Sequence, residues 1–268
     1  MRALVIVAVN VFREAVRDRV LYILVAFAVL LISVSFLLGQ LTAGQDVKII
    51  KDLGLAAIAT FGLLIAVFIG IGLVWKEVER KSIYSLLSKP IRRYEFILGK
   101  YAGLALTLFV NVAVMTLAFY AVLAFLNTRF PAPMRAAWPA PATDPGMLLA
   151  IALIFVELLL VTAIALFFST FSGPFLSAAL TLGLWVIGSF NADLRNFEAV
   201  LQSPAAGWIA RGLYYVLPNF AAFDVKAQVV HALPVPPAYV LTTAVYGVVY
   251  IALLLTASVL VFDRRDFK

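Results

Sequence analysis

The 268-residue sequence has no cysteine and a single histidine, His231. The lack of cysteine excludes disulfides, iron–sulfur clusters and thiolate zinc sites. Charged residues are also scarce, at 13% of the chain, whereas an ordinary soluble domain has about a quarter. Hydrophobic residues make up 64%. This composition predicts a chain that lies mainly in lipid rather than in water.

Motifs for catalysis are missing as well. The chain has no phosphate-binding loop of the form G-x-x-x-x-G-K-[ST], because the nearest Gly-Lys pair, Gly99 and Lys100, is followed by Tyr101 and has Tyr94 where the first glycine belongs. No paired acids lie in the apolar segments, and His231 falls in a proline-rich stretch, so hydrolytic and metal chemistry lack their residues. We expect a chain that is not an enzyme and binds no cofactor itself.

The apolar residues cluster in six long segments. A helix needs about 20 apolar residues to cross a hydrocarbon layer of about 30 Å. We therefore predict an all-α polytopic membrane protein, a single transmembrane domain over residues 1–268 with six transmembrane helices. The expected spans are 20–39, 53–75, 101–126, 146–171, 174–190 and 238–262. The fourth and fifth should form a hairpin, since only the turn at 172–174 separates them.

Basic residues indicate the orientation. Six spans place both termini on one side, and that side carries fourteen of the 21 lysines and arginines. The positive-inside rule makes it cytoplasmic, which predicts a multi-pass protein of the bacterial cell inner membrane. The net charge of +7 then reflects orientation and contact with anionic membrane lipids, so no nucleic-acid partner is expected.

Three segments outside the spans have distinct patterns. Residues 1–19 are expected to form an interfacial elbow helix, with a cytoplasmic start of the first span as the alternative. Its polar stripe comprises Asn10, Arg13, Glu14, Arg17 and Asp18, and its lipid-facing side comprises Val5, Val9, Phe12 and Val16. Residues 127–145 hold five prolines and should be extended and irregular. For residues 191–237, an external segment, we predict short helices in the outer leaflet. The alternative is a folded loop without a role in transport.

The cytoplasmic segment 76–100 is too charged to enter lipid, and its residue pattern is too regular for an unstructured linker. Ser82 is suited to cap a short helix, and Pro90 ends it while suiting the first turn of the next helix, which should continue into span three. Leu86 and Leu87 form an apolar edge on this short helix. It is either a docking knob for a cytoplasmic partner or a solvated, lipid-facing loop.

This segment resembles the coupling helix of the ABC type-2 permease family, the membrane subunits of ATP-driven exporters. The resemblance lies in Glu79, Ser82, Leu86, Leu87, Pro90, Arg93, Gly99 and Lys100, with further similarity at 214–226 and 262–267. It is greatest to the branch that includes the permease of the nitrous-oxide reductase maturation system.

The resemblance implies a pathway formed by two permeases, either two copies of this chain or a pair of related chains. It also implies separate ABC ATPase subunits, which would hold the ATP and Mg²⁺. Contact with the ATPase is expected from Glu79, Ser82, Leu86, Leu87, Pro90, Arg92 and Arg93.

Glu157 is the only formal charge within any predicted span. An ionisable residue inside a membrane is costly and is often functional. Glu157 could contact cargo in the pathway, be a protonated carboxyl group that is hydrogen-bonded to a neighbouring helix, or lie at the seam of a dimer. It also supports the alternative function, a proton-coupled secondary carrier that needs no ATPase.

Overall fold

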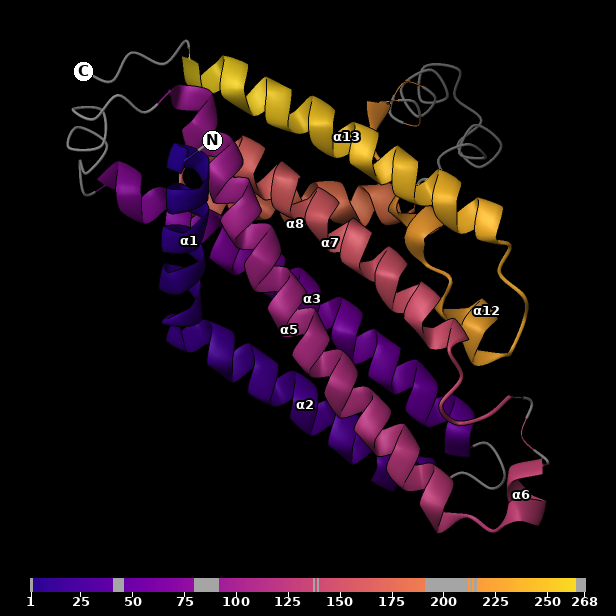
Figure 1. Cartoon of the computed structure of the whole chain (residues 1–268). Helices are drawn as coiled ribbons and strands as arrows, with labels where there is room; N and C mark the ends of the chain where they lie inside the picture. Colours follow the sequence, from indigo (N-terminus) through magenta and orange to yellow (C-terminus); the bar gives the residue numbers. More distant parts are fainter. Residues whose placement is uncertain are drawn as a thin grey trace.

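The computed structural model describes residues 2–40, 46–79, 92–136, 138, 140–190, 212, 214 and 216–263. Secondary structure in these ranges is helical, without strands, which confirms the all-α prediction. Figure 1 shows the long helices side by side in a bundle. The elements are α1 (Arg2–Val16), α2 (Arg19–Gln40), α3 (Asp46–Glu79), α5 (Arg93–Arg129), α6 (Ala132–Ala136), α7 (Gly146–Ser169), α8 (Pro174–Ser189), η1 (Phe220–Phe223), α12 (Lys226–Val230) and α13 (Pro237–Asp263).

Five of the described helices, α2, α3, α5, α7 and α13, are long and apolar enough to cross a membrane. The remaining predicted span, 174–190, corresponds to α8, an apolar helix of 16 residues. At 1.5 Å per residue it is roughly 24 Å long, somewhat shorter than a hydrocarbon layer of about 30 Å. The chain is thus a polytopic membrane protein with five long apolar helices and one short one among its described residues.

The turn between α7 and α8 has the tight form predicted from the sequence. Gly173 precedes α8 in an extended conformation, and Pro174 occupies its first position, where the missing N–H costs nothing. The hydroxyls of Ser172 and Ser177 lie 2.7 Å apart across the turn. Successive long helices alternate in direction, so α1 and the C-terminal end of α13 lie at the same end of the bundle (Figure 1).

The core of the bundle lies between α3 and α7, the two most buried long helices. Their inner faces are aliphatic, and they pack closely where one helix has a glycine. A Cβ atom at Gly62 of α3 would lie 2.4 Å from Leu158 Cδ1 of α7. Small residues thus let these two helices approach, as is common in membrane bundles. Helices α2 and α13 lie at the outside and expose most of their apolar surface.

Helix α3 begins earlier than the sequence predicted. We expected a polar loop before residue 53, but the helix starts at Asp46. Lys51 is buried with 2% of its surface exposed, and its ammonium group donates a hydrogen bond of 2.9 Å to the Pro141 carbonyl. The charge is therefore accommodated by a partner 90 residues away, rather than by a solvated loop.

The segment 127–145 is also more helical than predicted. Helix α5 continues to Arg129, and α6 follows over Ala132–Ala136. Pro131 and Pro133 lie just before and within the first turn of α6, where backbone N–H groups have no helical partner. The prolines therefore start this short helix instead of preventing it.

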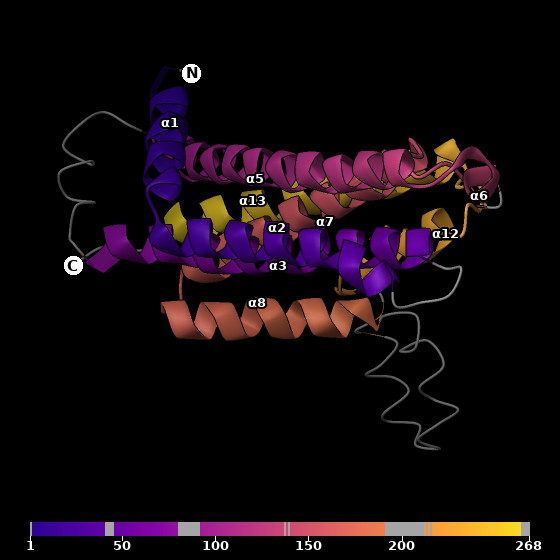
Figure 2. The ribbon, with the colours of Figure 1, turned by 90° about the horizontal axis from the view of Figure 1, so that it is seen from below.

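Helix α1 crosses the long helices and packs on the beginning of α5, as Figure 2 shows and as an elbow helix requires. Of the four residues predicted to face lipid, Val5 and Val9 are exposed, whereas Phe12 and Val16 are only partly exposed. The face that contacts the bundle, however, is formed by Val7, Val11 and Ala15.

Between α8 and α13 the described residues contain η1 and α12, two short helices. Residues 191–211, part of the predicted external segment, lie outside the described ranges.

Candidate coupling site

Three of the residues predicted to contact an ATPase are described, and they lie at the end of the bundle that carries α1 and the C-terminus of α13. Glu79 is the last residue of α3. Arg92 and Arg93 lie at the start of α5. Ser82, Leu86, Leu87 and Pro90 fall in 80–91, outside the described ranges. The structure therefore describes the two helix ends that flank the predicted coupling segment, the end of α3 and the start of α5.

Helix α5 begins at Arg93. Pro90, which was predicted to suit the first turn of this helix, lies outside the described residues. Arg92 precedes the helix in an extended conformation, and its N–H lies 3.4 Å from the Glu95 carboxylate. An acidic group in the first turn also suits the positive end of the helix dipole. As predicted, the helix then runs without a break into span three.

Arg93 connects α5 to the C-terminal end of α13. Its Nη1 donates hydrogen bonds to the carbonyls of Phe262 at 3.1 Å and Asp263 at 2.6 Å. Its Nε lies 3.8 Å from the Asp263 carboxylate. The last four carbonyls of a helix have no partner within it, and a cation there also meets the negative end of the dipole. Arg93 therefore caps α13 from a neighbouring helix.

Aromatic packing strengthens the same connection. The rings of Phe96 on α5 and Phe262 on α13 are stacked with centroids 5.7 Å apart. The buried ammonium group of Lys100 lies 4.5 Å from the centroid of the Phe96 ring, within range of a cation–π interaction. The first two turns of α5 thus hold the end of α13 through both polar and apolar contacts.

Two glycines on α5 bring α1 into backbone contact with the same region. A Cβ atom at Gly99 would lie 2.8 Å from Val7 Cβ, and one at Gly103 would lie 2.6 Å from the Ala8 carbonyl oxygen. Both distances are shorter than real Cβ contacts, so only glycine permits this approach. The spacing of four residues places both glycines on one face of α5. The start of α5 is therefore in direct backbone contact with α1.

Arg92 differs from Arg93 in its surroundings. Its side chain is exposed and donates a hydrogen bond of 3.3 Å to the Tyr94 hydroxyl, which raises the pKa of the guanidinium group. Adjacent arginines thus present one cation to the surface and one to α13. The sequence pattern assigned both to the rim of a docking surface and did not reveal the contact of Arg93 with α13.

Glu157 lies within the bundle and has a defined partner. The indole N–H of Trp185 on α8 donates a hydrogen bond of 2.8 Å to its Oε1. This contact links α7 to α8, as one of the three alternatives for Glu157 anticipated. Trp185 was not among the residues predicted from the sequence.

Residues 5–267 match the family described as ABC-2 family transporter protein. No curated protein matches the chain. Since the family match covers nearly the whole sequence, this chain belongs to the ABC-2 transporter family and is an integral, multi-pass permease subunit of an ABC transporter.

Proposed function

We propose that this permease forms a translocation pathway with a second copy or a related chain, and that a separate ATPase drives it through residues 82–89. The family to which the chain belongs works with an ABC ATPase, and the sequence carries no phosphate-binding loop of its own. In this proposal Leu86 and Leu87 anchor the segment in a groove of the ATPase. Apolar anchors with a charged rim are typical of such contacts.

The observation that carries the proposal is the capping of α13 by Arg93. The segment 80–91 leads directly to Arg92 and the first turn of α5. A displacement of the docked segment is therefore applied where α5 contacts both α13 and α1. In this mechanism the start of α5 distributes one movement to three helices, instead of moving span three alone.

Nucleotide can drive such a movement only if the ATPase binds the two conformations of the permease with different affinity, because a partner that binds both equally shifts nothing. We propose inward-open and outward-open states that differ in the position of α5. ATP and Mg²⁺ are held by the ATPase in this scheme, and the permease responds to the change in its contacts.

The orientation follows from the same proposal. The end of the bundle with α1, the 170–173 turn and the end of α13 faces the cytoplasm of a bacterial cell, in agreement with the distribution of basic residues. The end with α6 and α12 faces outward. The transport direction is export, as in the branch that matures nitrous-oxide reductase, which the coupling segment resembles.

The test replaces Leu86 and Leu87 together with Asp, in the permease co-expressed with its ATPase. Neither residue lies in an apolar span, so the variant should insert normally, yet two buried charges should release the ATPase. We expect loss of co-purification and of permease-stimulated ATP hydrolysis. Leu233→Asp makes the same chemical change at an exposed position on the opposite end of the bundle and should retain both. A correctly inserted double variant that still co-purifies and hydrolyses ATP at the parental rate would end the proposal.

A further inference from the structure

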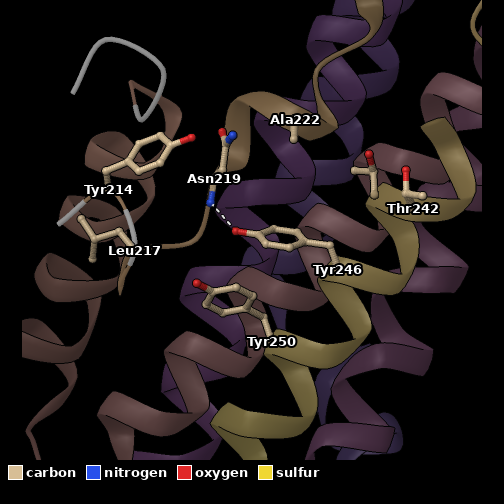
Figure 3. A pocket seen from close by; sticks show the side chains of 8 residues that line it. Tyr214, Leu217, Asn219, Ala222, Thr242, Tyr246 and Tyr250 are labelled. Atoms are coloured by element: carbon tan, nitrogen blue, oxygen red, sulfur yellow. Dashed lines mark hydrogen bonds between the residues drawn. The ribbon is translucent and has the colours of Figure 1, made fainter. Parts of the chain in front are cut away.

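A cavity of about 420 Å³ lies between α13 and the segment that precedes η1 (Figure 3). It is close to the end of the bundle that carries α12, far from the coupling site. Its wall is mainly formed by residues with hydroxyl or amide groups, which is unusual in a chain this apolar. These are Tyr214, Asn219, Thr242, Thr243, Tyr246 and Tyr250.

The polar groups on α13 form a stripe. Thr242, Tyr246 and Tyr250 recur every four residues and so share one face of the helix, and Thr243 lies three residues before Tyr246 beside them. Figure 3 shows Tyr246 and Tyr250 projecting from α13 toward the segment that carries Asn219. Their rings are 4.9 Å apart between centroids. Polar residues in an apolar helix are costly when they face lipid, and here they face a cavity.

Asn219 is positioned by its backbone and keeps an unused acceptor. Its backbone N–H donates a hydrogen bond of 2.8 Å to the Tyr246 hydroxyl. Its side-chain oxygen is buried and has no hydrogen-bond partner among the described residues. A buried polar atom without a partner costs about 1 to 3 kcal/mol. A donor group of a ligand in the cavity could satisfy this oxygen.

The charge of the wall limits what can bind. None of the described lining residues is charged. The nearby Asp224 and Lys226 form a salt bridge with each other at 3.2 Å and do not line the cavity. A phosphate, carboxylate or ammonium group would find no counter-charge among these described residues, and burial of a charge without one is costly. Hydroxyl groups both donate and accept hydrogen bonds, as the tyrosine and threonine hydroxyls do.

We propose that this cavity binds an uncharged, hydroxyl-rich group, that is, a sugar, either free or as the headgroup of a lipid. Sugar rings offer C–H surface to the tyrosine rings and hydroxyls to the surrounding polar groups. The volume lies in the range of small-molecule sites, about 300 to 1,000 Å³. This site is independent of the proposed coupling to an ATPase. Sugar binding can therefore be measured on the permease alone.

The chain contains no cysteine, so a single introduced cysteine reports on the cavity without background. Thr242→Cys is placed in the exposed part of the wall, and the full-length protein is held in phospholipid nanodiscs and labelled with a polar maleimide. The probes are methyl β-glucoside as a free sugar, octyl β-glucoside below its micelle concentration as a lipid-like sugar, and glucose 6-phosphate as a charged analogue. Ala136→Cys on α6, exposed and remote from the cavity, is the matched control.

We expect the neutral glucosides to slow labelling at Thr242→Cys and not at Ala136→Cys, and glucose 6-phosphate to have little effect. If octyl glucoside protects the cysteine at a much lower concentration than methyl glucoside does, the ligand is a lipid headgroup. If both protect at the same concentration, the ligand is a free sugar. Adding Tyr250→Phe removes one hydroxyl while keeping the ring, and should raise the required concentration about three- to tenfold. The proposal is overturned if neither glucoside protects, if the control cysteine is protected equally, or if Tyr250→Phe changes nothing.

Discussion

Replacement of Gly103 by alanine should separate α1 from α5. The added Cβ would lie 2.6 Å from the Ala8 carbonyl oxygen and 2.7 Å from Val11 Cβ. Real Cβ atoms almost never approach within 3.0 Å. The first of these atoms belongs to the backbone of α1, so no side-chain rotation relieves the clash. The whole elbow helix must shift.

The size of the effect follows from two opposing terms. Overpacking at a tight contact costs about 1 to 3 kcal/mol, while alanine in a helix is about 0.8 to 1 kcal/mol more favourable than glycine. The two terms together give a net loss of about 0 to 2 kcal/mol, and we expect the upper part of this range because the nearest clashing atom belongs to the backbone. Gly183 on α8 is the matched control, since a Cβ there meets nothing within 4 Å. Gly183→Ala should leave stability unchanged or raise it slightly.

The assay is reversible unfolding in mixed micelles with increasing denaturing detergent, followed by far-UV circular dichroism. Hydrogen exchange of residues 3–16 then shows whether the lost stability resides in α1. Gly103→Ala should unfold at a lower detergent fraction than the parent and exchange faster in α1. Equal stability of Gly103→Ala and Gly183→Ala would refute the close backbone contact between α1 and α5.

Two further predictions concern Glu157 and the orientation. Glu157→Gln retains an acceptor for the Trp185 N–H and should assemble normally. Glu157→Leu leaves that N–H without its acceptor and should lower the yield of folded protein. A Gln variant that assembles but leaves ATP hydrolysis uncoupled would instead favour a role of Glu157 in proton transfer or cargo contact. In intact cells a membrane-impermeant maleimide should label Ala136→Cys and spare Ser85→Cys, and the reverse pattern would contradict the proposed orientation.

The positions of the spans were predictable because a soluble fold seldom contains apolar runs of about 20 residues, whereas a membrane helix requires them. The hairpin between α7 and α8 was predictable from Gly173 and Pro174, which act locally. The start of α3 was not, because Lys51 becomes compatible with a buried helix only through the Pro141 carbonyl, 90 residues away. Local charge alone made 46–52 look like a loop.

The face of α1 that contacts the bundle was not predictable, and the reason differs from that for α3. Its first half is apolar on nearly every side, so Val7 and Val11 cannot be told from Val5 and Val9 by periodicity. The signal lay instead in the partner helix, where Gly99 and Gly103 are four residues apart, a spacing typical of close helix packing. The small residues of α5 therefore mark the surface on which α1 docks.

The contact of Arg93 with α13 and the polar wall of the cavity are also long-range features. Nothing near Arg93 in the sequence distinguishes it from Arg92, and the difference appears only when the end of α13 is adjacent. Tyr246 and Tyr250 did leave a local signal, since two tyrosines four residues apart are conspicuous on an apolar helix. That signal is shared with aromatic residues at any membrane interface.

The central claim is that movement of the coupling segment reaches α13 through Arg93. Spin labels at Thr128→Cys on α5 and Leu241→Cys on α13 report the separation of these helices at the far end of the bundle, in complexes diluted with unlabelled permease. We predict that trapping the ATPase with nucleotide changes this distance distribution in the parent and in Arg92→Gln. In Arg93→Gln the ATPase should remain bound, while the change is lost. An Arg93→Gln complex that shows the same nucleotide-dependent change as Arg92→Gln would contradict the account.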